Sequence, residues 1–233
     1  MYLNSYQLKY IALIAMIIDH MAIVFRTSMS HTLYLLLRGI GRQAFPIFCF
    51  LLVEGFLHTR SRSRYLARLL LFSILSELPY DLALQKTYRI LGSSLSTLRL
   101  MDWSEQNVFF TLALGLLAMM LLDRYRHQTV NTLAIIVGLP CLAEWLHTDY
   151  GSIGVLTIIL FYLYRRDGRI PLWFCYLPLL LLILDFQIQV CCIASYLLIQ
   201  TYNGEQGRGN RYLFYIAYPL HLLLLCALHM FLL

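Results

Sequence analysis

Long apolar stretches, each followed by a short polar segment, run through the whole chain. This alternation predicts membrane-spanning helices, although several stretches are shorter than the roughly 20 residues of a straight span and are expected to tilt or stop short. We predict about nine spans, or eight if one of the two stretches between 171 and 202 does not cross. The nine lie near residues 8–26, 43–59, 66–84, 108–123, 130–147, 151–165, 171–185, 187–202 and 213–232.

The composition agrees with this pattern. Hydrophobic residues make up 60% of the 233 residues, charged residues only 13%, and the mean hydropathy is +0.69. A soluble domain carries about 25% charged residues, so this class of protein is excluded. The 17 tyrosines and three tryptophans suit membrane interfaces. We therefore predict an all-α, polytopic transmembrane helix bundle that forms a single domain over residues 1–233.

The distribution of basic residues favours a cytoplasmic N-terminus. With this orientation, 12 of the 18 lysines and arginines lie on the cytoplasmic side. These inner loops also account for the net charge of +6, with membrane lipid as their partner and no nucleic acid. The first apolar stretch lacks a basic leader and a small-residue cleavage site, so it is predicted to be a retained helix. The longest polar stretch, 86–107, is expected outside, where it could cap a cavity.

The spacing of the cysteines does not indicate a disulfide framework or a metal site. All six lie in apolar stretches, without Cys-x-x-Cys spacing. We predict inert buried thiols, with neither a disulfide framework nor a metal site.

An Asp19-His20 pair lies in the middle of the first apolar stretch. Ionisable side chains in hydrocarbon are costly, so they are candidates for function. Lys9 and His20 are eleven residues apart, close to three helical turns, so they share one face about 16 Å apart along the axis. This spacing fits a ligand with a phosphate head and a long thin arm, such as coenzyme A. The alternative is a lysine that reaches the interface and a histidine bonded to a neighbouring helix.

Asp19 points about 100° away from His20 and needs a partner of its own. The nearest cations by depth are Arg38 and Arg42, at the outer start of the second predicted span. We favour an Asp19–Arg42 ion pair. The alternative is that Arg42 faces the outer lipid headgroups.

The second predicted span is irregular and carries a buried acid. Gly39 and Gly41 permit close helix approach or a broken start, and Pro46 bends or opens the helix. Glu54 lies deep in the inner half, where a lone carboxylate indicates a functional site. Pairing with an arginine of the following loop is the alternative.

Four arginines follow at the inner interface. The planar guanidinium group of arginine is suited to phosphate, whereas a topology signal that faces anionic lipid is the simpler explanation. The four are Arg60, Arg62, Arg64 and Arg68.

Further polar groups gather at the outer ends of later spans. Glu77 and Asp81 flank Pro79, which suggests a broken helix that lines a cavity, and Asn107 leads into the next span. Glu144 and His147 lie at the outer end of the fifth span. An amine or cationic substrate could dock among the acidic groups of the outer side. An ordinary solvated rim is the alternative for Asp102, Glu105 and Asp149.

The last predicted span contains Pro219 and His221. Because proline frees backbone groups inside a helix, Tyr215 or Tyr218 could help to satisfy them. His221 is either a second site histidine or a packed polar contact.

Taken in order, these segments resemble the TraX family, which includes the conjugative-pilin N-acetylase. The resemblance covers almost the whole chain, including Ile-Asp-His at 18–20, Arg-Gly-Ile-Gly-Arg at 38–42, Ser-Glu-Leu-Pro-Tyr-Asp at 76–81 and Tyr-Pro-Leu-His at 218–221. Further matching segments lie at 53–60, 65–69, 106–112 and 149–151. The family is also similar to a wider group of membrane acyltransferases, in which a basic residue precedes a histidine by eleven positions in an early helix.

The resemblance implies an acetyltransferase of the bacterial cytoplasmic (inner) membrane. It would move an acetyl group from cytoplasmic acetyl-CoA to an extracytoplasmic acceptor, such as the N-terminal amine of a pilin or another exported peptide. Alternatives are O-acetylation of a sugar or envelope polymer, or a non-enzymatic role as a transporter or a subunit of the conjugation machinery. No metal is implied.

The resemblance also suggests a role for each candidate residue. His20 is expected to be the general base, with Arg42 stabilising the oxyanion or holding Asp19. No nucleophile is obvious, so direct transfer is favoured over a transient acetyl-histidine. The residues expected to hold the phosphates of acetyl-CoA are Lys9, Arg60, Arg62, Arg64 and Arg68. Those expected to line the substrate pocket are Arg38, Glu54, Glu77, Asp81, Asn107 and His221.

Overall fold

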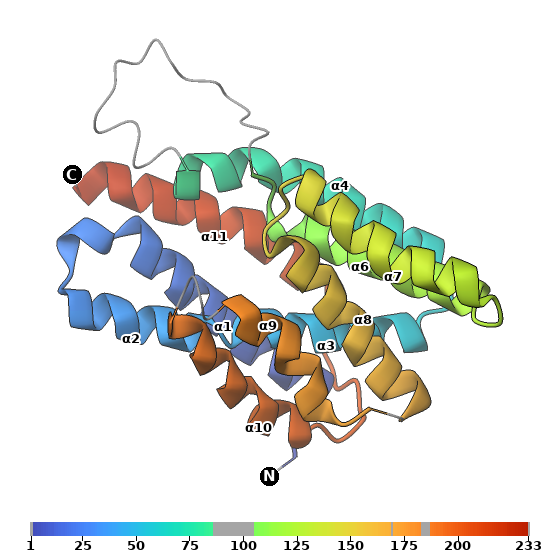
Figure 1. Cartoon of the computed structure of the whole chain (residues 1–233). Coiled ribbons are helices and arrows are strands. Elements are labelled where there is room, and N and C mark those ends of the chain that lie inside the picture. The colour runs from blue at the N-terminus through green and yellow to red at the C-terminus, as the bar shows by residue number, and fades with distance from the viewer. Residues whose placement is uncertain (1, 86–104, 169, 183–186, 233) are drawn as a thin grey trace. The chain divides into compact units, whose positions relative to one another are not determined.

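The computed structural model describes residues 2–85, 105–168, 170–182 and 187–232 (Figure 1). Within these ranges the chain is helical apart from its connecting loops and two isolated bridges, Leu3–Tyr202 and Gln106–Thr148. The predicted all-α class is confirmed for this part of the protein. Most of the polar stretch expected to cap a cavity, residues 86–104, lies outside the described residues.

Residue contacts divide the chain into two compact units. The first comprises Met1–Phe45, Ile74–Trp103 and Cys191–Leu233, and the second comprises Pro46–Ser73 and Ser104–Val190. Each unit therefore combines segments that are far apart in the sequence. The single domain predicted over 1–233 stays a prediction.

Helix α1 (Ser5–Val24) is central to the first unit. It packs against α2 (His31–Gly41), against α11 (Arg211–Leu232) and against a π-helical turn (Asp81–Gln85). Its N-terminus is closed by a capping box, in which the side chain of Asn4 accepts from the amide of Gln7. A 3-10 turn (Arg26–Ser28) leads into α2, and α10 (Ala194–Gln200) completes the described helices of this unit.

One face of α1 carries the residues that make these contacts. Leu8, Ala12, Ala15, Asp19 and Ala22 are all buried and recur at alternating spacings of four and three residues. This spacing places them on one stripe of the helix. Because three of the five are alanines, neighbouring backbones can approach closely, as is usual for helix contacts in membranes.

Helix α2 was not predicted as a separate element. The second span was predicted at 43–59, where α3 (Ala44–His58) is found, but the helical stretch begins at His31. The predicted broken start is confirmed, because α2 ends at Gly41 and α3 begins at Ala44. Pro46 lies in the first turn of α3, where the missing backbone N–H costs no hydrogen bond.

Three helices that follow one another in the sequence form the main part of the second unit. They are α6 (Val108–Arg124), α7 (Thr129–Trp145) and α8 (Gly151–Asp167), and they pack on one another. Helix α8 also packs against a 3-10 turn (Leu172–Tyr176) and α9 (Leu177–Leu181). Most of α3 and the first part of α4 (Arg62–Tyr80) belong to this unit. Buried aromatic rings such as Phe56 and Tyr162 meet edge to face in its core, with centroids 5.6 Å apart.

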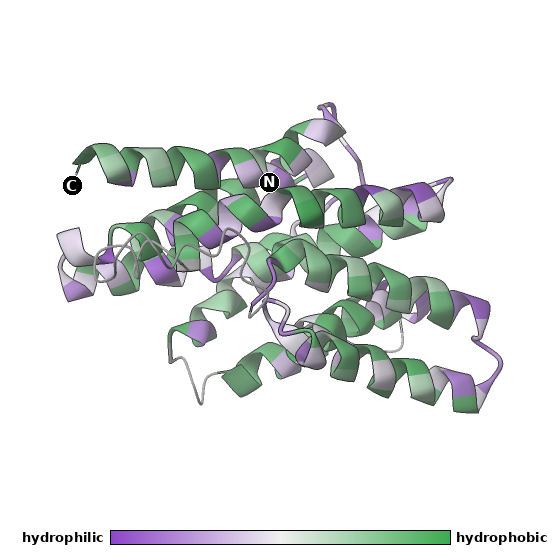
Figure 2. Cartoon of the chain, turned by 90° about the horizontal axis from the view of Figure 1, so that it is seen from above, coloured by the Kyte–Doolittle hydropathy of each residue, from purple (hydrophilic) through white to green (hydrophobic). Residues whose placement is uncertain are grey.

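Apolar residues cover most of the helical surface, and hydrophilic residues gather at helix ends and in the loops (Figure 2). Among the described residues, three stretches are long and apolar enough to cross a membrane: Ser5–Val24, His31–His58 and Tyr212–Leu232. By these features the chain is a membrane protein. The nine spans and the cytoplasmic N-terminus stay predictions.

The two stretches between 171 and 202 are not continuous helices in the described residues. The first contains a 3-10 turn and the five residues of α9, and the second contains a 3-10 turn (Gln187–Ile193) and the seven residues of α10. Pro171 and Pro178 explain the first break, because proline favours the start of a helix and not its interior.

Candidate functional site

His20 of α1 and His221 of α11 meet in the first unit. Nδ1 of His20 lies 2.7 Å from Nε2 of His221, and Nδ1 of His221 lies 2.8 Å from the backbone oxygen of Ala217. The ring of Tyr218 presents an edge-on contact to both imidazoles, with centroids 6.1 Å and 5.6 Å away. Helix α1 therefore contributes one histidine and α11 the other, and an aromatic side chain holds both rings.

The carboxylate of Asp19 lies beside this pair and binds two arginines. Its Oδ2 is 2.5 Å from Nη1 of Arg38 and 2.5 Å from Nη2 of Arg42. The predicted Asp19–Arg42 ion pair is thus confirmed, and Arg38 shares the same oxygen. The three side chains are 8–16% exposed, so the pairing takes place largely away from solvent.

Gly41 allows α2 to come this close to α1. A Cβ atom at this position would overlap the Oδ1, Cβ and Cγ atoms of Asp19. The glycine pair predicted to permit close approach therefore does so at Gly41, and this contact aligns both arginines with the carboxylate.

Glu77 and Asp81 are buried in the first unit, with 1% and 0% of their surface exposed. Helix α4 contains Pro79 and changes to a π-helical turn at Asp81. The helix is thus irregular where a break was predicted, but it continues directly from α4 into the turn. The turn packs against α1 and α11, the helices that carry the histidine pair. The cavity that both acids were predicted to line stays a prediction.

Lys9 lies on α1 toward its N-terminal end and is partly buried. Its ammonium nitrogen is 4.9 Å from the ring centre of Tyr6 and 5.6 Å from that of Phe214. No carboxylate of the described residues forms an ion pair with it. Lys9 is thus a cation held by aromatic faces without a counter-charge, which suits an anionic ligand.

The loop between α10 and α11 is hydrogen-bonded to the N-terminal end of α1. Oη of Tyr6 donates to the backbone oxygen of Gly209 at 2.6 Å, and the amides of Ser5 and Tyr6 donate to the backbone oxygens of Glu205 and Gln206. This glycine-rich loop is thus fastened to α1 by three hydrogen bonds.

The four arginines predicted to bind phosphate belong to the second unit, whereas Lys9 belongs to the first. The residues predicted to bind phosphate therefore do not all belong to one unit. Arg60 and Arg64 are exposed. Arg62 binds Asp123 at 2.5 Å and lies 4.2 Å from the ring centre of Phe56. Arg68 lies over Tyr65, 5.7 Å from its ring centre.

Two residues predicted to line the substrate pocket, Glu54 and Asn107, form polar contacts within the second unit. Glu54 is 3% exposed and binds Nε of Arg165 at 2.5 Å. The paired alternative for Glu54 is therefore observed, but its partner comes from α8 and not from the following loop. Asn107 caps α6 by accepting from the amide of Phe109, and it donates to the backbone oxygen of Ser73 at 2.8 Å. Sequence reasoning missed Arg165 because 111 positions separate it from Glu54.

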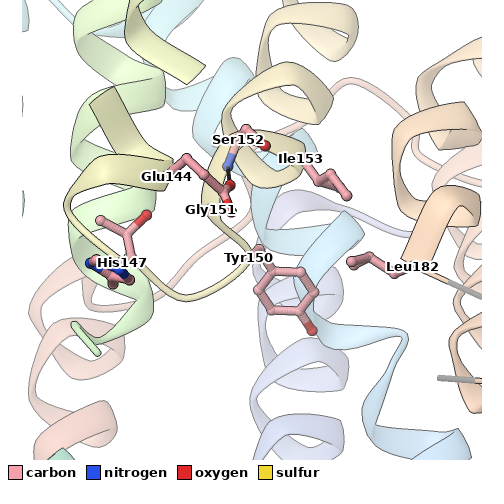
Figure 3. Close-up of a pocket in the computed structure, with 8 residues that line it drawn as sticks. Glu144, His147, Tyr150, Gly151, Ser152, Ile153 and Leu182 are labelled. Carbon is pink, nitrogen blue, oxygen red and sulfur yellow. Dashed lines mark hydrogen bonds between the residues drawn. The ribbon is translucent and has the colours of Figure 1, made fainter. Parts of the chain in front are cut away.

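A cavity of about 270 Å³ lies at the α7–α8 connection of the second unit (Figure 3). Glu144 lines it and accepts from the amide of Ser152 at 2.9 Å, so the carboxylate also caps α8. His147 and Tyr150 line it with positive φ angles of 53° and 62°, which non-glycine residues rarely adopt. The predicted cluster of Glu144 and His147 is thus present, with Glu144 in the last turn of α7 and His147 in the tightly turned loop that follows.

Comparison with known proteins now identifies the family. The family described as TraX protein matches residues 4–229. The chain belongs to the TraX family. A relative from Dichelobacter nodosus named "Probable fimbrial assembly protein FimC, serogroup H1" is 35% identical over 246 residues, covering 98% of this chain and 97% of the relative. No solved structure matches.

The predicted TraX resemblance is confirmed, and the structure gives it a physical meaning. Three of the resembling segments, 18–20, 38–42 and 218–221, meet in the first unit, where they contribute the histidine pair and the arginines around Asp19. In this TraX protein, the segments that carry the resemblance are thus those that bring ionisable side chains together inside apolar helices.

Proposed function

We propose that this TraX-family protein is an acetyltransferase of the bacterial cytoplasmic membrane that acts in pilus or fimbrial assembly. It transfers an acetyl group from cytoplasmic acetyl-CoA to the N-terminal amine of an exported peptide, such as a pilin subunit. The family and the name of the fimbrial relative support the assembly role. The observation that carries the chemistry is the hydrogen bond between His20 and His221, since His20 lies on α1, the helix that also bears Lys9.

The reaction needs a base but no nucleophile from the protein. The unprotonated amine of the acceptor attacks the carbonyl carbon of the thioester while His20 takes a proton from the amine nitrogen. The carbon–sulfur bond then breaks, and the sulfur leaves with the proton that His20 returns. The products are the N-acetyl peptide and free coenzyme A. A histidine suits both steps because its ordinary pKa lies near neutral pH.

The arginine pair places two cationic groups beside Asp19. Both guanidinium groups bind the same carboxylate oxygen, at 2.5 Å each. The tetrahedral intermediate places a negative charge on the former carbonyl oxygen of the thioester. A fixed positive charge in a largely buried site stabilises such an oxyanion without reorganisation of solvent. Arg42 is the proposed donor, with Asp19 and Arg38 holding it in place.

Lys9 is proposed to bind the phosphate end of acetyl-CoA. It lies about three helical turns from His20, or roughly 16 Å along the axis. The ammonium group of Lys9 has no carboxylate partner in the described residues, and it lies over the rings of Tyr6 and Phe214. A phosphate here and a thioester at His20 would place the arm of the donor along α1.

The test is an acetylation assay with the full-length protein in lipid nanodiscs. The probes are acetyl-CoA and a synthetic peptide with a free N-terminal amine, and mass spectrometry detects the product. We expect His20→Ala to lower the rate by at least about 10²-fold, the contribution of a general base. His31→Ala, at an exposed histidine at the start of α2, is the matched control and should keep the wild-type rate.

Two outcomes would contradict the proposal. Acetylation by His20→Ala at the wild-type rate would remove His20 as the base. Equal acetylation of the same peptide with a blocked N-terminus would show that a hydroxyl is the acceptor and not the amine.

A further inference from the structure

We infer that His221 is the positioning residue of the site: it fixes the His20 ring so that Nδ1 carries the proton and the lone pair lies on Nε2. The catalytic meaning of this inference rests on the function proposed above. The hydrogen-bond arrangement itself does not, and it can be observed separately.

The two imidazoles lie end to end and not face to face. Their planes differ by only 7°, and their centroids are 5.0 Å apart although Nδ1 of His20 and Nε2 of His221 are 2.7 Å apart. The distance between the centroids exceeds the distance between the two nitrogen atoms by the sum of the two centroid-to-nitrogen distances within the rings. Both nitrogen atoms therefore lie on the line between the centroids, and the rings are nearly coplanar. This alignment directs an in-plane N–H at an in-plane lone pair.

The positions of the protons on both rings follow from the hydrogen bond that Nδ1 of His221 forms with Ala217. A carbonyl oxygen only accepts, so Nδ1 of His221 must donate to the backbone oxygen of Ala217. In a neutral imidazole the other nitrogen is then an acceptor. Nε2 of His221 thus accepts, and Nδ1 of His20 donates to it. The lone pair of His20 is left on Nε2, which forms no hydrogen bond in the described part of the chain.

The local sequence holds His221 in this orientation. His221 and Ala217 are four residues apart on α11, so the imidazole folds back over the preceding turn of its own helix. His221 is 7% exposed and Tyr218 is 3% exposed, and the tyrosine ring packs edge-on against both imidazoles. Neither histidine ring can turn over without the loss of a buried hydrogen bond.

His221 thus does what a carboxylate does in a Ser-His-Asp triad, where the third residue fixes the tautomer of the base. Asp19 does not take this role, because its Oδ2 binds Arg38 and Arg42. A neutral histidine avoids the cost of another buried charge within apolar helices. When His20 receives a proton on Nε2, its Nδ1–H still points at His221, which stabilises the imidazolium.

The experiment combines ¹⁵N NMR of histidine-labelled protein in nanodiscs with the acetylation assay. The ring ¹⁵N shifts report which nitrogen carries the proton. We expect His20 to be protonated on Nδ1 in the wild-type protein. His221→Phe, which keeps an aromatic ring but removes the acceptor, should mix the two His20 tautomers and lower the rate by at least about 10²-fold.

His221→Gln is the conservative variant. The amide oxygen of glutamine can accept from Nδ1 of His20, so this variant should keep the wild-type tautomer and a rate within about tenfold of wild type. His229→Phe is the matched control on the same helix. His229 is also buried, but its ring nitrogens form no hydrogen bond in the described residues, so both readouts should stay at wild-type values.

A His20 ring protonated on Nε2 in the wild-type protein would overturn the inference. So would His221→Phe with the wild-type tautomer and rate. If instead the wild-type protein shows the expected tautomer but acetylates no amine or hydroxyl probe, the proposed function fails while the hydrogen-bond assignment stands.

Discussion

At the scale of single residues, the high cost of an unpaired buried charge explains why Asp19 and Glu54 are bound to arginines. The Asp19–Arg42 pair could be predicted because the predicted spans place both residues at similar depth, near the adjoining ends of successive spans. The second arginine on the same oxygen could not, because it depends on how closely α2 approaches α1. The partner of Glu54 could not be predicted either, since Arg165 is remote in sequence and only the packing of α8 brings it near.

Removal of the Asp19 charge should be costly. In Asp19→Asn, two largely buried guanidinium groups lose their counter-charge, and we expect the free energy of unfolding to fall by about 3–5 kcal/mol. Denaturant unfolding of the purified protein in detergent measures this. Asp123→Asn is the matched control, because it removes a similar pair with Arg62 whose side chains are 31% and 41% exposed. It should cost less than about 1 kcal/mol, and equal losses for both variants would contradict the buried pairing.

At the scale of elements, regular apolar helices could be predicted well, whereas irregular ones could not. The stretches that became α6, α7 and α8 were placed within a few residues. Helix α2 was missed because Gly39 and Gly41 suggested a broken start and not the end of a preceding helix. The segments around Pro171 and Pro178 read as spans by hydropathy, which does not register that proline interrupts the backbone hydrogen bonds.

The contact between α1 and α2 can be tested with one methyl group. Gly41→Ala places a Cβ atom onto the side chain of Asp19, so either the carboxylate or the helix must move. We expect the variant to lose about 1–3 kcal/mol of unfolding free energy, as overpacked sites do. Thermal unfolding in detergent measures the loss.

Gly138→Ala in α7 is the corresponding control. A Cβ atom at Gly138 meets nothing within 4 Å, so alanine should stabilise the helix by about 0.5–1 kcal/mol. If both variants shift stability in the same direction, helix propensity alone explains Gly41 and the close contact is irrelevant.

At the scale of the whole molecule, hydropathy and the family resemblance were sufficient to predict a helical membrane protein of the TraX family. They did not predict the division into two units, because each unit gathers segments from distant parts of the sequence. The roles of Lys9 and of the arginines around residue 60 came from the resemblance and the spacing of basic residues. The structure places these residues in different units, so their joint action on one ligand remains a hypothesis.

That hypothesis makes a kinetic prediction. Arg60 and Arg64 are exposed, so the double variant Arg60→Gln/Arg64→Gln should fold normally. If they bind the phosphates of acetyl-CoA, its apparent KM should rise at least about tenfold, the value of one charge-assisted hydrogen bond, with kcat little changed. Steady-state acetylation measures both constants.

Arg124→Gln/Arg126→Gln, which removes two basic residues from the α6–α7 connection, is the control. It should leave KM unchanged. An equal rise in KM for both double variants would show that general charge attraction, and not a phosphate site, is responsible.

The separation of the two histidines along the chain has a consequence for biosynthesis. His20 and His221 are 201 positions apart, and residues 3–6 are fastened to the loop that precedes α11. During translation, 201 residues must follow His20 before its partner His221 is made. Until then, Asp19 has its arginines but His20 has no acceptor. On the proposed mechanism, the tautomer of the base is set only once α11 is present, so a chain that ends before α11 carries an incomplete centre.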